Sequence, residues 1–101
     1  MIDRGTTTTI QYNFKVVDPA RIVTAYLTLK QDSVLVIEKD LSEATVGENF
    51  IYWTLSQEET LSLDEKMQVE YECRYKLDDG SAFKTKKVSE QVGPILKEGV
   101  I

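Results

Sequence analysis

Apolar residues alternate strictly with polar or charged residues over residues 67–75 of the chain. Successive side chains of a strand point to opposite faces, so this pattern places one face in a core and the other in solvent. A sustained period of two is typical of a half-buried antiparallel strand. The face predicted to be buried carries Met67, Val69, Tyr71, Cys73 and Tyr75.

Asp78, Asp79 and Gly80 predict a hairpin directly after this strand. A three-residue loop pairs Tyr75 with Phe83, whereas a two-residue loop would place lysines on the apolar face. In the three-residue loop Gly80 takes the left-handed position at the end of the turn. The same register sets three further pairs opposite each other: Cys73 with Thr85, Glu72 with Lys86, and Arg74 with Lys84.

Several other segments have strand-like patterns, separated by Asp18-Pro19 and by the turn residues 31–33. On the second of these strands we expect Val23, Ala25, Leu27 and Leu29 to point inward. The predicted strands cover residues 6–16, 23–30, 34–39, 44–46, 50–55 and 83–88, the last of which residues 89–92 extend.

Two strands carry bulky residues on both faces. Residues 34–37 are four consecutive apolar residues, so either both sides are covered or part of the run contacts a partner. In residues 50–55 we assign Trp53 to the core, because a tryptophan in a small sandwich usually packs centrally. Phe50 and Tyr52, together with Tyr26, then fall on exposed faces and are candidate interaction residues.

Ser56 and Glu59 form a capping box, which predicts one short helical turn near residues 56–62. The remaining pattern is β throughout. The sequence therefore predicts an all-β fold: an Ig-like antiparallel β-sandwich of six to seven strands.

Residues 1–101 are expected to form a single domain whose two ends are candidate docking segments. Residues 1–9, which include four threonines, are either an N-terminal arm or the start of an edge strand. Residues 93–101 form a C-terminal tail that either closes the sandwich or inserts into a neighbour. Its candidate interaction residues are Ile95, Leu96, Val100 and Ile101.

Composition argues against several classes of function. The chain has no histidine, and its glycines form no phosphate-binding loop, so we expect no enzyme, metal site or cofactor. A net charge of −5 argues against nucleic acid as a partner. The single cysteine, Cys73, lies on the apolar face and is expected to be a small buried residue.

No stretch approaches the ~20 apolar residues needed to cross a bilayer, and residues 1–9 have no apolar run of the kind found in a signal peptide. We therefore expect neither membrane insertion nor secretion through a signal peptide.

The segments TAYLTLK (24–30), FIYWTLSQEET (50–60) and residues 69–83 with their Asp79-Gly80 turn resemble a known family. They are similar to small Ig-like β-sandwich proteins of phages and prophages of Gram-positive bacteria, including the N-terminal domain of phage baseplate upper proteins. The shared order is a hydrophobic strand, a leucine with an acidic short turn, a long strand beginning with tyrosine, and an Asp-Gly hairpin. The resemblance spans most of the chain.

This resemblance implies a non-enzymatic structural or assembly protein, associated with a virion, tail or baseplate. In baseplate proteins a fibre or receptor-facing region follows the domain, whereas this sequence stops at Ile101, which implies a stand-alone subunit. The expected partners are other phage structural proteins or further copies of the chain, and the expected location is the bacterial cytoplasm during expression and then the virion. The alternative is a free-standing carbohydrate-binding sandwich that uses the exposed aromatics.

Overall fold

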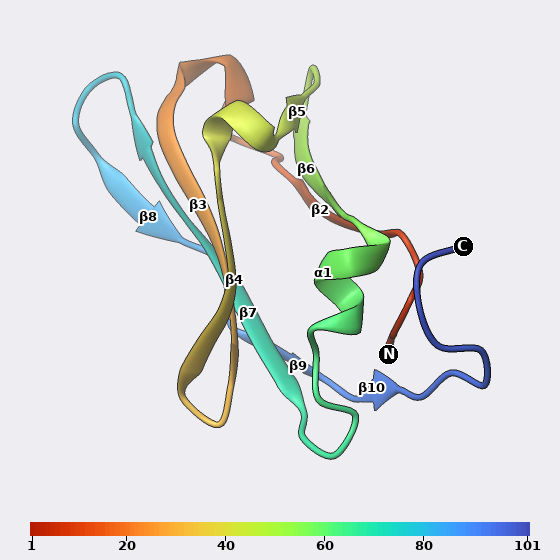
Figure 1. Cartoon of the computed structure of the whole chain (residues 1–101). Coiled ribbons are helices and arrows are strands. Elements are labelled where there is room, and N and C mark those ends of the chain that lie inside the picture. Colours follow the sequence, from red (N-terminus) through yellow and green to blue (C-terminus); the bar gives the residue numbers. More distant parts are fainter.

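The protein is described by a computed structural model covering residues 1–101. It consists of two facing β-sheets and a separate two-stranded pair (Figure 1). The helical segments are α1 (Gln57–Leu61) and the 3-10 turns η1 (Pro19–Arg21) and η2 (Leu41–Glu43). The strands are β1 (Ile2–Asp3), β2 (Thr8–Asn13), β3 (Ile22–Gln31), β4 (Val34–Asp40), β5 (Thr45–Val46), β6 (Phe50–Leu55), β7 (Val69–Leu77), β8 (Ala82–Lys84), β9 (Val88–Glu90) and β10 (Val92–Gly93).

The strand order is that of an Ig-like sandwich. One sheet has the order β2-β6-β5 and the other β4-β3-β7-β8, with β9 also paired to β7. In immunoglobulin lettering these sheets correspond to strands B, E and D, and to strands C′, C, F and G. β1 pairs in parallel with β10 instead of joining the first sheet. The position beside β2, where strand A lies in immunoglobulin domains, is therefore not filled by this chain.

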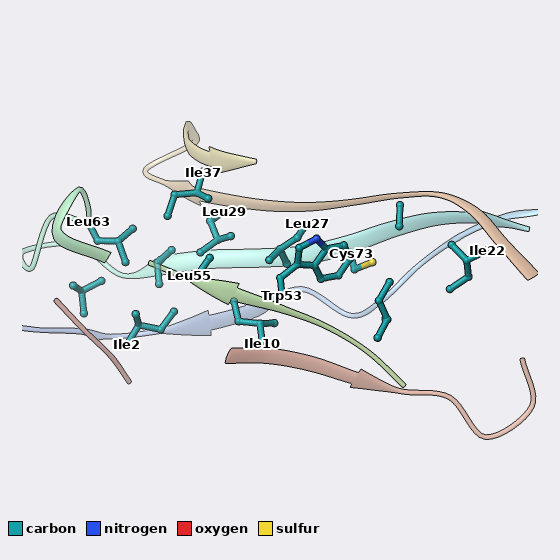
Figure 2. Packing of buried hydrophobic residues seen from close by; sticks show 14 of the residues in the cluster. Ile2, Ile10, Ile22, Leu27, Leu29, Ile37, Trp53, Leu55, Leu63 and Cys73 are labelled. Carbon is teal, nitrogen blue, oxygen red and sulfur yellow. The ribbon is translucent and has the colours of Figure 1, made fainter. Parts of the chain in front are cut away.

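The core lies between the two sheets and is organised around Trp53, as predicted. Trp53 is fully buried and reaches from β6 toward Leu27 and Cys73 of the opposite sheet (Figure 2). Its indole nitrogen donates to the backbone oxygen of Asp40 at 2.9 Å, so the one polar atom of the side chain is satisfied. Cys73 is buried and free, as expected.

The predicted capping box is confirmed. The hydroxyl of Ser56 accepts from the amide of Glu59 at 3.1 Å, and the Glu59 carboxylate accepts from the amide of Ser56 at 2.8 Å. These bonds satisfy two of the free amides at the start of α1. At the other end of the turn Thr60 is buried, and its hydroxyl donates to the backbone oxygen of Thr6 at 2.8 Å. The helix is thereby fixed to the segment that leads into β2.

The hairpin after β7 also forms in the predicted register. Tyr75 lies opposite Phe83, and Gly80 has a φ of 88°, the left-handed value that the three-residue loop requires. The prediction for Glu72 is wrong: its carboxylate accepts from Lys84 at 3.0 Å, not from Lys86. The reason is that the return strand breaks after β8 and resumes at β9 with its register shifted.

The inward face predicted for the start of β3 is wrong. A bulge between Ile22 and Thr24 shifts the register, so Ile22 is buried and Val23 is 51% exposed. Most strand boundaries also differ from expectation by one or more residues: β7, for example, begins at Val69, and β2 ends at Asn13. The strand count rises above the six to seven expected because the return strand is split and the first residues form β1.

The first residues belong to the folded body. Ile2 is 1% exposed within the core cluster, and its amide donates to the backbone oxygen of Gln91 at 3.0 Å. β1 and β10 thus close one end of the sandwich. This role was one of the two alternatives predicted for the C-terminal tail. No helix of the structure is long and apolar enough to cross a membrane.

Candidate interaction surface

The chain brings together no group of three potential metal ligands. Burial raises the pKa of the Cys73 thiol to about 12, so this cysteine is not a thiolate near neutral pH. The largest hollow, about 610 Å³, lies on the outer face of β3, β4 and β7. Among the charges that line it, Lys87 lies 3.5 Å from Glu70 and Glu72 lies 3.0 Å from Lys84, and this face is a solvated strand surface.

The three candidate aromatics do not share one surface. Tyr26 lies on the outer face of β3, whereas Phe50 and Tyr52 lie on the outer face of β6 in the other sheet. Phe50 and Tyr52 are half-buried and stack with their ring centroids 6.0 Å apart. The Phe50 ring also covers Gly47, where a Cβ would lie 2.1 Å from a ring carbon. This contact gives Phe50 a packing role at the turn between β5 and β6.

The C-terminal tail carries apolar side chains that the rest of the chain does not cover. Leu96 is fully exposed, Ile101 is 90% exposed and Val100 is 56% exposed, while only Ile95 is half-buried. Figure 1 shows this segment (dark blue) continuing past β10 and then turning back, so that its end lies near the red N-terminal segment. Of the predicted interaction residues, Leu96, Val100 and Ile101 are therefore available to a partner.

Beyond Gly93, which belongs to β10, the tail forms no regular secondary structure and is fixed to the body by a few polar contacts. The side chain of Gln57 donates to the backbone oxygen of Ile101 at 3.2 Å and accepts from its amide at 2.8 Å. Arg4 donates to Glu98 at 2.9 Å. The backbone groups of residues 96–100 make no hydrogen bond within the chain. Exposed contacts of this kind stabilise the fold by about 1 kcal/mol or less each, so detaching the tail from the body requires little free energy.

Three of the sheet edges carry features that oppose pairing with another strand. β4 has a bulge, where its register against β3 shifts between Leu29 and Lys30, and it points the charge of Lys39 inward to Glu59 at 2.9 Å. β5 is only two residues long. The edge formed by β8 and β9 is interrupted at residues 85–87, which include two lysines.

The edge of β2 has none of these features. β2 contains no charge and no proline, and it pairs with β6 from Thr8 to Asn13 without a register shift. Phe14, which continues this register, donates to the backbone oxygen of Asn49 at 2.8 Å. Because hydrogen-bonded positions alternate in an antiparallel pair, the amides and carbonyls of Thr9, Gln11 and Asn13 face away from β6. These three residues form an open row of donors and acceptors, called the β2 edge below.

A groove of about 410 Å³ runs beside the β2 edge. One wall is β2 itself, and the other comes from the opposite sheet and from β1. Most of the lining is uncharged or apolar, and the carboxylate of Glu90 is bound by the amine of Met1 at 2.7 Å. The side chains that give the groove its shape are Ile2, Ile10, Tyr12, Tyr71, Val88 and Glu90.

No protein-family model matches the chain, and no curated protein matches it either. Among solved structures, the chain is similar to the Ig-like domain of mouse leukocyte-associated immunoglobulin-like receptor 1, solved as a strand-swapped dimer. That match has a TM-score of 0.52 at 15% identity and covers 94% of this chain and 85% of the other. It confirms the Ig-like sandwich.

The sequence pointed to the tail but not to the β2 edge. The uncharged pattern of residues 8–13 was visible, yet an open edge depends on strand order, which one sequence does not define. The signal that could have revealed this edge is that residues 1–7 contain no strand pattern able to pair with β2.

Proposed function

We propose that this protein is a non-enzymatic assembly protein that associates with itself and with other structural subunits of a phage or prophage particle. The observation that carries the proposal is the tail, in which the apolar side chains of Leu96, Val100 and Ile101 are exposed within six residues of one another. Exposed apolar groups gathered in one segment are typical of protein contacts. The phage context rests on the resemblance of residues 24–30, 50–60 and 69–83 to Ig-like phage proteins.

The similar mouse Ig-like domain was solved as a strand-swapped dimer. An Ig-like fold can therefore associate by exchanging a strand between copies, which supports self-association as part of this proposal. We place the protein in the bacterial cytoplasm while it is made and in the particle afterwards.

The test is whether the chain is a component of phage particles. Particles from the bacterium that encodes it are purified on a density gradient, and their proteins are quantified by mass spectrometry. The proposal predicts the chain at a fixed copy number per particle or per assembly intermediate. Its absence from both, while the known capsid and tail proteins are found, would refute the phage role.

The carbohydrate-binding alternative has less support. Tyr26 lies on the sheet opposite Phe50 and Tyr52, so the three aromatics cannot stack on one sugar chain, and Phe50 is occupied by Gly47. A glycan array with the unmodified chain and with Tyr52→Ala tests it directly. Binding lost in the variant would favour this alternative, and no binding by either protein would remove it.

A further inference from the structure

We propose that the groove beside β2 binds residues 96–101 of a second copy of this chain as an added β-strand. This inference rests on the proposed function in one respect, because it takes the tail as an assembly element. It adds the surface that receives the tail and the kind of contact made there. In β-strand addition, backbone hydrogen bonds supply affinity, and alternate side chains fill the pockets of the groove.

The two surfaces have complementary backbone groups. Thr9, Gln11 and Asn13 point their amides and carbonyls out of the β2 edge, and residues 96–100 of the tail have backbone groups without any partner. β2 has six residues, and so does the segment 96–101. At about 3.3 Å per residue both span about 20 Å when extended, so one can pair along the whole length of the other.

The groove favours a single strand over the edge of another sandwich. Its walls come from both sheets, since β9 and Tyr71 lie across from β2. A second copy approaching with its own β2 edge would bring its opposite sheet into the same space. Residues 96–101 pair with no other strand of their own chain, so they can enter this space as a single strand.

The side chains and charges also fit. The groove offers apolar surface from Tyr12 and Val88, and the tail offers Leu96, Val100 and Ile101, which are exposed in the single copy. β2 has no charge, and the tail has one lysine and one glutamate, so pairing sets no like charges opposite each other. The other edges would oppose the tail with a bulge, an inward lysine or a gap in the strand.

A matched pair of proline variants of the full chain tests the β2 edge. In Gln11→Pro the lost amide is one that faces the groove, while the bonds from β2 to β6 remain. Val46→Pro is the control at the opposite edge of the same sheet. The amide of Gly47 donates to Phe50 of β6, and hydrogen-bonded positions alternate, so the amide of Val46 faces away from β6 and its loss breaks no bond of the sheet. Both variants are first checked for folding by circular dichroism and by the fluorescence of buried Trp53.

Self-association is then measured by sedimentation equilibrium. We expect Gln11→Pro to raise the dissociation constant by about tenfold or more, equivalent to about 1.4 kcal/mol, and Val46→Pro to leave it unchanged. Equal association by the two folded variants would overturn the inference. If association were lost in Leu96→Asp but kept in Gln11→Pro, the tail would dock elsewhere: the proposed function would stand and this inference would fail.

Amide exchange of the unmodified chain gives a second readout that does not depend on the stability of a variant. We expect the amides of Thr9, Gln11 and Asn13 to exchange at least about tenfold more slowly in concentrated than in dilute protein. Association without slower exchange at these three amides would overturn the inference. A chain that stays monomeric at every concentration would overturn both the inference and the self-association in the proposed function.

Discussion

Replacing Gln31 with leucine should destabilise the domain strongly, although Gln31 is the last residue of β3, next to the hairpin turn. Its side chain is 3% exposed and joins the β3–β4 hairpin to the loop before β7. The side-chain nitrogen donates to the backbone oxygens of Asp64 at 2.8 Å and Met67 at 3.2 Å, and the side-chain oxygen accepts from the amide of Asp64 at 2.9 Å. Three bonds at about 1 kcal/mol each give a loss of about 3 kcal/mol.

Burial of the apolar leucine side chain adds about 1 kcal/mol to the free energy of unfolding, so the expected net loss is about 2 kcal/mol. For a domain of this length such a loss lowers the melting temperature by about 10 °C. Urea unfolding followed by Trp53 fluorescence measures the free energy of unfolding, with Gln68→Leu as the control because Gln68 is exposed. A difference between the two variants below about 0.5 kcal/mol would refute the assignment of Gln31 as a structural link.

Three further predictions concern the turn, a carboxylate and the cysteine. Gly80→Ala should lower the free energy of unfolding by about 1 kcal/mol in urea unfolding, because the φ of Gly80 is 88° and no atom lies near the added Cβ. Gly80→Asn should lower it less, since asparagine tolerates this backbone conformation better than alanine. Equal losses in the two variants would contradict a backbone origin. Burial alone would raise the pKa of Glu59, but hydrogen bonds from Ser56 and Lys39 outweigh burial and hold this pKa below its ordinary value of 4.5. The ionised Glu59 carboxylate therefore stabilises the fold above pH 4.5. This stabilisation is lost as the pH falls through the lowered pKa. Glu59→Gln should flatten the acid side of the stability curve, and an unchanged curve would contradict this. Burial raises the pKa of Cys73 to about 12, so a thiol reagent should label it only at the rate of unfolding, and rapid labelling in native buffer would contradict the buried placement.

Local patterns were sufficient for the elements in which neighbouring residues determine the geometry. The parity of apolar positions around Asp79-Gly80 selected the three-residue loop, and the spacing of Ser56 and Glu59 located α1. The burial of Trp53 was predicted from the usual central packing of a tryptophan in a small sandwich, because both faces of residues 50–55 carry bulky side chains. These features share one property: the residues that decide them lie within a few positions of one another.

Long-range pairing accounts for what the sequence did not show. β1 consists of two residues that pair with β10 about 90 positions away, and no local pattern marks them. The bulge beside Val23 reversed one residue of an otherwise correct face, because a bulge depends on the partner strand β7. The tail was recognised as a docking candidate from its apolar residues, but the β2 edge became visible only when strand order left it unpaired.

The most direct test of the account is the molar mass in solution of the full chain and of a chain ending at Ile95. The shorter chain keeps every buried core residue, and Trp53 fluorescence verifies its fold. For the full chain we expect light scattering to give an average molar mass that rises with concentration toward that of a discrete oligomer. For the shorter chain we expect the mass of a monomer. The same mass for both chains at all concentrations would contradict assembly through the tail.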